Sequence, residues 1–146
     1  MKKMLFAALM GIAISVSAFA APTKVSARIL SRFSAEFVNA SDVQWKTTDV
    51  YAKATFVLEG STVEVFYDLQ GEKIGTSRAI TVKSLPKSAQ DLIAKKYAAY
   101  TVKEAISFTD TDEVVKQYVS LETEKTKVVL EISAAGDVSV LSKSSK

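Results

Sequence analysis

The chain has 146 residues, of which 48% are apolar and 24% are charged, and it contains neither cysteine nor histidine. This length is enough for one domain or two very small ones. The missing residue types exclude disulfides, the commonest general base and the commonest transition-metal ligand. Beyond residue 20 the chain carries 17 Lys and Arg (19 minus Lys2 and Lys3) against 16 Asp and Glu, a net charge of +1. No basic surface for nucleic acid is therefore expected.

Residues 1–20 have the pattern of a secretory signal peptide. Lys2 and Lys3 are followed by an apolar run from Leu5 to Val16 and by an Ala18-Phe19-Ala20 cleavage site. We expect a periplasmic or secreted protein with no membrane span after cleavage. The alternative is an uncleaved anchor, although the apolar run is short for a span.

A first helix is predicted from Pro22 to Asn39, since apolar residues recur there at three- and four-residue spacing (Val25, Ile29, Leu30, Phe33 and Phe37). Asn39 is expected to cap its C-terminus. A short strand, Val43 to Lys46, should follow. Its Trp45 is interpreted as a core residue, with ligand stacking as the alternative.

The stretch from Ala54 to Gly71 predicts a β-hairpin followed by a tight turn. Alternating apolar residues indicate that Phe56 and Leu58 share a face with Val63 and Val65. A type II′ loop at Gly60-Ser61 would place Leu58 opposite Val63. Gly71 is expected at positive φ. A fourth strand is predicted from residue 73 to residue 82.

A weaker copy of this hairpin runs from Val119 to Gly136, shifted by 65 residues, so that Gly71 falls on Gly136. A second helix is predicted from Ser84-Leu85-Pro86 to Tyr97, with Pro86 in its first turn. Strands are predicted over 101–108, 114–123, 127–133 and 137–141, before a frayed tail, 142–146. The chain thus reads as two repeats, 21–83 and 84–146, after the signal peptide.

The order of motifs resembles the PepSY-like family of small exported bacterial proteins, described as β-lactamase-inhibitor-like. The matching residues form F-x-N-A-x-x-V-x-W (Phe37 to Trp45), V-E-V-x-Y-D-x-x-G (Val63 to Gly71) and the pair Leu85-Pro86. The resemblance implies an α+β fold of two tandem helix-plus-four-strand repeats, with helices packed on one face of a shared antiparallel sheet. It also implies a non-enzymatic envelope protein, with inhibitor activity by analogy of fold.

Three groups of residues are candidates for chemistry. Asp110, Asp112 and Glu113 are interpreted as a solvated turn, because they lack the spacing of an EF-hand calcium loop. Ser88 and Lys95 lack any nucleophile motif and are interpreted as helix-surface residues. Five outward-facing hairpin residues are predicted to line the uncovered side of the sheet and to bind a partner: Tyr51, Val57, Phe66, Tyr118 and Val129.

The predicted function is a non-catalytic binding or inhibitor-type module of the cell envelope, acting through the open face of its sheet. We expect no cofactor, no metal and no nucleic acid, and an envelope protein as partner. Two alternatives stay open: a carrier of an apolar small molecule between helices and sheet, and a small secreted hydrolase.

Overall fold

The computed structural model describes residues 24–146, so the predicted signal peptide and Pro22 lie outside the described residues. The helical elements are α2 (Ala27–Glu36), the 3-10 turn η1 (Val82–Ser84) and α3 (Lys87–Lys96). The eight strands are β1 (Ser41–Thr47), β2 (Tyr51–Leu58), β3 (Ser61–Asp68), β4 (Lys73–Ala79), β5 (Thr101–Asp110), β6 (Val115–Glu122), β7 (Thr126–Ile132) and β8 (Val138–Ser145).

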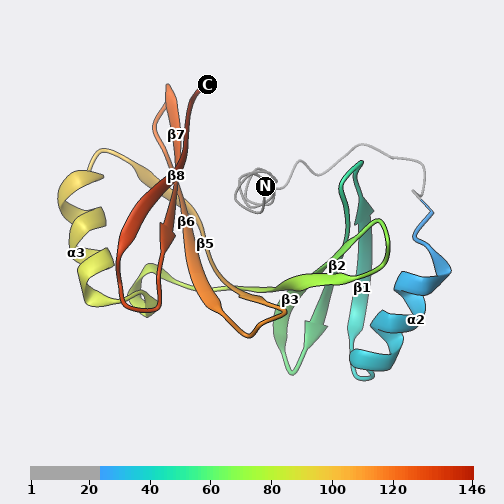
Figure 1. Cartoon of the computed structure of the whole chain (residues 1–146). Coiled ribbons are helices and arrows are strands. Elements are labelled where there is room, and N and C mark those ends of the chain that lie inside the picture. Colours follow the sequence, from blue (N-terminus) through green and yellow to red (C-terminus); the bar gives the residue numbers. More distant parts are fainter. Residues whose placement is uncertain (1–23) are drawn as a thin grey trace. The chain divides into compact units, whose positions relative to one another are not determined.

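The described chain is mostly an eight-stranded antiparallel sheet whose strand order follows the chain from β1 to β8 (Figure 1). It is 51% strand and 19% helix. The expected fold of two helix-plus-four-strand repeats, with helices packed as a layer on one face, is therefore wrong. Each α-helix has only ten residues and buries only two side chains, which is too little to form a layer over eight strands.

Both predicted helices were too long. Ser26 begins α2 instead of Pro22, because its side-chain oxygen accepts a hydrogen bond from the Ile29 N–H at 3.3 Å. The helix ends at Glu36, so Asn39 is not its cap. Pro86 was predicted in the first turn of the second helix, but it is the N-cap residue, one position before α3 begins at Lys87.

The chain divides into two compact units, each described here by itself. The N-terminal unit contains residues 24–78 and 108–114, and the C-terminal unit contains residues 79–107 and 115–146. The two units are defined by contacts within the structure and not by similarity between halves of the sequence. They therefore do not test the predicted repeat boundary after residue 83, which stays a prediction.

The core of the N-terminal unit joins α2 to one face of β2 and β3. Ile29 and Phe33 are its helical members, and Ala54, Phe56 and Val65 are among its strand members. The Phe33 ring lies 5.1 Å from the Phe56 ring in an edge arrangement. Trp45 also packs on Phe33, at 5.2 Å, which places it in the core.

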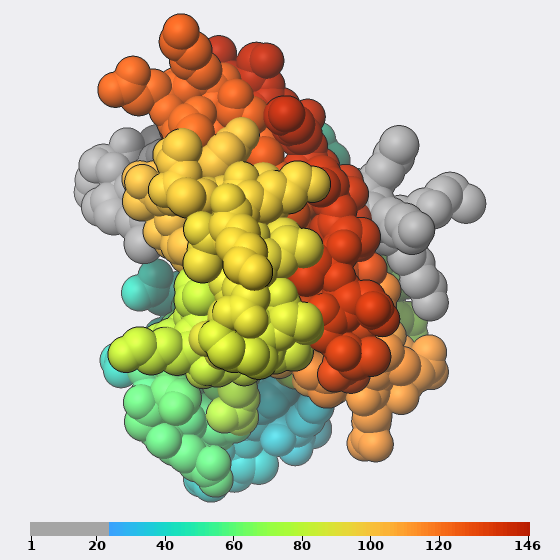
Figure 2. Space-filling model, turned by 90° about the vertical axis from the view of Figure 1, so that its left-hand side faces the viewer, coloured from blue at the N-terminus to red at the C-terminus, as the bar shows by residue number. Residues whose placement is uncertain are grey.

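The core of the C-terminal unit is mostly aliphatic, with Tyr97 as its buried aromatic member. Ala89 and Ile93 of α3 are buried together with Val119, Leu121 and Leu130 of β6 and β7. Val138 of β8 packs against this cluster, and Figure 2 shows α3, in yellow, alongside β8, in red. Strand β8 reaches Ser145, which pairs with Thr126. The predicted frayed tail is therefore wrong, because residues 142–145 form ladder hydrogen bonds with β7.

The first hairpin keeps the predicted faces but not the predicted partners. Phe56 lies opposite Val63, and Leu58 lies opposite Ser61, two residues from the expected pairing. The turn is formed by Glu59 and Gly60, both at positive φ (51° and 76°), which is the type I′ pattern. Because the shift is two residues, each side chain stays on its own face. Gly71 and Gly136 have φ of 85° and 92°, as predicted.

Tyr67 presents a buried hydroxyl that can be tested for its effect on stability. Its side chain is 1% exposed, and its oxygen has no hydrogen-bond partner among residues 24–146. A buried unpaired hydroxyl costs free energy, so Tyr67→Phe is expected to stabilise the protein by about 1 kcal/mol. Chemical denaturation at neutral pH measures this, with Tyr97→Phe as the control; a loss of stability on Tyr67→Phe would contradict it.

The same residue predicts a pH dependence. Burial and then the charge of Glu36 raise the pKa of Tyr67 to about 12. Above the unfolded pKa, near 10, only the unfolded state releases this proton, so stability is full below pH 10 and falls up to pH 12. Unfolding curves over this range should show a shallower decline in Tyr67→Phe. Equal slopes in the two proteins would contradict the assignment.

Candidate functional site

The side of β2, β3 and β4 that faces away from α2 carries a polar and aromatic cluster. We call it the N-terminal outer face and define it as Tyr51, Lys53, Thr55, Glu64, Phe66 and Ser77. Side chains alternate along each strand, so these residues lie on the other face of the sheet from the core members Ala54 and Val65. Cross-strand pairing brings Thr55 and Ser77 to either side of Glu64.

Glu64 is the centre of this face. Its Oε1 accepts hydrogen bonds from Lys53 Nζ at 2.5 Å and from Thr55 Oγ1 at 3.2 Å, while its Oε2 accepts one from Ser77 Oγ at 3.2 Å. The Lys53 side chain is only 12% exposed, and Ser77 is buried. Three donors from two flanking strands thus hold one carboxylate in a fixed position.

Aromatic rings adjoin this carboxylate. The Tyr51 and Phe66 rings are 5.7 Å apart in an edge arrangement, and Phe108 lies 6.1 Å from Phe66. Lys53 Nζ lies 5.9 Å from the centre of the Phe66 ring. Burial, and then the negative charge of Glu64, raise the pKa of Tyr51.

The C-terminal unit has a comparable arrangement, which we call the C-terminal outer face (Lys116, Tyr118, Ser120, Val129 and Glu131). Glu131 accepts hydrogen bonds from Lys116 Nζ and from the Tyr118 hydroxyl, both at 3.1 Å. Val129 lies opposite Ser120, one of the few buried polar residues of the described chain. Each unit therefore combines a Lys–Glu pair with an aromatic ring.

Four of the five predicted binding residues belong to these two faces, but their side chains are buried. Tyr51 and Phe66 are each 2% exposed, Val129 is 1% exposed and Tyr118 is 0% exposed. Val57 is half-buried. The expectation of exposed rings is therefore wrong, since the rings pack on one another and on the carboxylate networks. Whether these residues bind a partner stays a prediction.

The acidic turn forms the predicted local structure. Asp110 Oδ1 accepts hydrogen bonds from the backbone N–H groups of Asp112 and Val114, both at 2.9 Å, and Glu113 has positive φ. Within residues 24–146 no group of three acidic side chains is placed to hold a metal ion. Ser88 also has a structural contact, because its hydroxyl donates to the Gly136 carbonyl at 2.9 Å.

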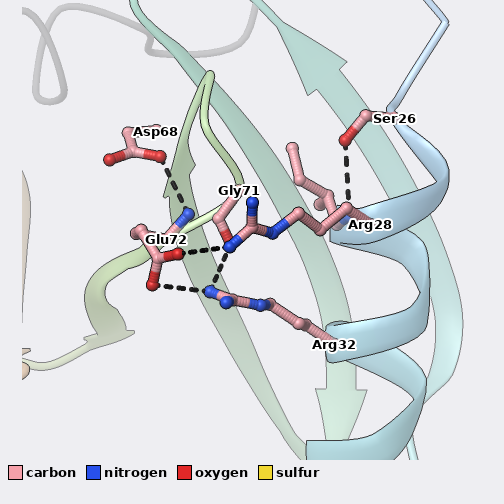
Figure 3. A network of polar contacts seen from close by, with 7 residues as sticks. Ser26, Arg28, Arg32, Asp68, Gly71 and Glu72 are labelled. Carbon is pink, nitrogen blue, oxygen red and sulfur yellow. Dashed lines mark hydrogen bonds and ion pairs between the residues drawn. The ribbon is translucent and has the colours of Figure 1, made fainter.

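A contact that sequence reasoning missed joins α2 to the turn between β3 and β4 (Figure 3). Arg28 and Arg32 both pair with Glu72, at 2.8 and 2.7 Å, and Arg32 also donates to the Gly71 carbonyl at 2.7 Å. The pKa of Glu72 is lowered, mainly by the hydrogen bond from Arg32. The spacing of Arg28 and Arg32 showed a shared helix face, but only the fold shows that this face meets the turn.

The C-terminal unit also contains a polar groove with a volume of about 670 Å³. Its walls are the beginning of β5, the loop between β6 and β7, and Lys146. The lining side chains are charged or hydroxyl-bearing except at one alanine (Ala99, Thr101, Lys103, Glu122, Thr123, Glu124, Lys125, Thr126 and Lys146). Such a lining suits a polar ligand rather than an apolar one.

The fold is similar to that of several solved bacterial proteins. A DUF2874 family protein from Bacteroides uniformis superposes with a TM-score of 0.69 at 16% identity, covering 84% of this chain and 90% of the other. A BLIP-like protein from Bacteroides fragilis gives 0.65 at 21% identity, covering 86% and 89%. A Bacteroides eggerthii protein inferred to be periplasmic gives 0.69 at 13% identity, covering 84% and 89%.

These likenesses support a BLIP-like fold, which is the class that the structure defines, and they do not confirm the PepSY-like part of the resemblance. No family model matches the chain, and no curated protein matches its sequence. None of the helices within residues 24–146 is long and apolar enough to cross a membrane.

Proposed function

We propose that the exported protein is a non-catalytic binding module of the cell envelope that holds a protein partner on its outer faces. The observation that carries this proposal is the Glu64 network beside the rings of Tyr51 and Phe66. Aromatic residues are enriched at the centres of protein interfaces, and an oriented charge pair beside them can select the partner by its charge. The likeness to a BLIP-like protein and to a protein inferred to be periplasmic supports the general class.

The rings that would form this surface are buried in the structure, so the proposal requires the face to open in solution. The predicted binding residues Tyr51, Val57, Phe66, Tyr118 and Val129 would then line it together with the Lys–Glu pairs. Chemical modification of tyrosine in the exported protein tests their accessibility, with the core residue Tyr67 as an internal control. Tyr51 and Tyr118 should react faster than Tyr67. If all three are equally protected, the proposed surface does not exist.

The binding test uses the exported protein as bait in an envelope extract. Glu64→Gln should reduce capture of the specific partner, because it weakens the oriented charge pair while keeping the side-chain shape. Lys95→Gln, on exposed helix surface, is the control for the loss of one charge. Thermal unfolding verifies that the Glu64→Gln protein is folded. If the folded variant captures the partner as well as the wild type does, this face is not the binding surface.

The carrier alternative receives no support from the N-terminal unit. Between α2 and the strands, Phe33 is already packed against Phe37, Trp45 and Phe56, with ring centres 5.1–5.3 Å apart. An apolar ligand would have to displace these rings from a close-packed core. Native mass spectrometry of the purified protein would reveal a bound lipid or other apolar ligand.

Export itself is a separate prediction. The sequence predicts cleavage after Ala20, so the protein recovered from the periplasmic fraction should begin at Ala21. N-terminal sequencing decides this. A chain that still begins at Met1 would refute the predicted processing.

A further inference from the structure

The groove of the C-terminal unit is built from segments that are held to one another. The Lys146 N–H donates to the Lys125 carbonyl at 2.9 Å, and Lys146 Nζ pairs with Glu122 at 2.5 Å. The Thr123 side chain accepts hydrogen bonds from the N–H groups of Lys125 and Thr126, at 3.3 and 3.0 Å. The loop between β6 and β7 is therefore ordered by its own contacts, which lowers the entropy cost of binding a ligand there.

Lysines outnumber carboxylates in the lining of this groove by three (Lys103, Lys125 and Lys146) to two (Glu122 and Glu124). The pKa of Glu122 is lowered, mainly by the hydrogen bond from Lys146. The positive charges of Lys146, Lys127 and Lys103 lower it further. Glu122 is itself a carboxylate, so the structure already shows one carboxylate stabilised by lysines at this position. Among the described residues, Lys103 and Lys125 form no ion pair with an acidic side chain.

We propose that this groove binds a small ligand that carries several carboxylate groups, contacted by Lys103 and Lys125. Lysine donates charge-assisted hydrogen bonds to carboxylate oxygens, and Thr101 and Thr126 supply hydroxyl groups in the lining. The proposed ligand is hydrophilic because all but one of the lining side chains are charged or hydroxyl-bearing. This site is independent of the outer faces, so either proposal can fail without the other.

Citrate is a suitable probe, because it is small, hydrophilic and carries three carboxylates. Titration of the ¹⁵N-labelled protein at constant ionic strength should shift the amide signals of Thr101, Lys103 and Lys125 in a saturable manner. The double variant Lys103→Gln/Lys125→Gln should bind citrate roughly tenfold more weakly or worse, since it loses two charge-assisted contacts. Lys95→Gln/Lys96→Gln, with the same change of net charge on α3, should bind as the wild type does.

Three outcomes would overturn the proposal. The first is the absence of saturable shifts at the groove, and the second is equal weakening in both double variants, which would indicate a general charge effect. The third is equally tight binding of inorganic phosphate at the same ionic strength, which would show that the groove does not select carboxylates. The substituted lysines are on the surface, and thermal unfolding verifies that the variants fold.

Discussion

Replacing Gly75 with alanine is expected to destabilise the protein by about 3 kcal/mol, the upper part of the range for overpacking a core. Gly75 lies in β4 opposite Phe66, and the Phe108 ring lies directly over it. A Cβ at this position would collide with that ring and would lie 2.5 Å from the Thr109 carbonyl oxygen. Because that oxygen belongs to the backbone, side-chain rotation cannot remove the collision.

Chemical denaturation of Gly75→Ala measures this effect. Gly60→Ala is the matched control, because a Cβ at Gly60 meets no atom within 4 Å. Gly60→Ala should destabilise the protein less, because its only cost is that of placing a Cβ on a left-handed backbone. Equal stabilities of the two variants would show that Phe108 does not pack over Gly75.

The second large effect is expected for valine at Gly136. An L-residue at its φ of 92° costs about 1–2 kcal/mol. A Cβ there would also lie 2.5 Å from Ser88 Oγ and 3.1 Å from Pro86 Cβ. The hydroxyl would have to leave the Gly136 carbonyl, so the total loss should reach about 3 kcal/mol.

The three turn glycines form a graded series that separates backbone strain from contact. Gly71→Val meets the flexible Arg28 side chain at 3.2 Å, and Gly60→Val meets nothing. The loss of stability should therefore rise from Gly60→Val through Gly71→Val to Gly136→Val. Melting temperatures of the three variants check the order. If Gly60→Val destabilises the protein as much as Gly136→Val does, the backbone φ alone determines the loss of stability.

The turns show how far local sequence reasoning extends. Positive φ at Gly71 and Gly136 was predicted correctly, because a tight turn requires it from the residue itself. The position of the first turn was not, since Glu59-Gly60 and Gly60-Ser61 both contain glycine and both keep Phe56 and Val63 on one face. Alternation records the face of each residue, whereas the partner depends on the register between two segments.

The outer faces show where local reasoning stops. The sequence placed Tyr51 and Phe66 on the side away from the helix, and this was correct. It could not show that Lys53 and Ser77 converge on Glu64, because these residues come from three different strands. It also could not show that the rings are buried, since burial depends on contacts with segments far away in the chain, such as that of Phe66 with Phe108.

By itself, the sequence determined strand parity and the two positive-φ glycines, both of which follow from spacing within a few residues. The tertiary structure alone decided that the helices are short and that residues 142–145 pair with β7. It also decided that Arg28 and Arg32 meet Glu72, and that Phe108 covers Gly75. The physical reason is common to these features: each depends on contacts between segments far apart in the chain, which no local periodicity encodes.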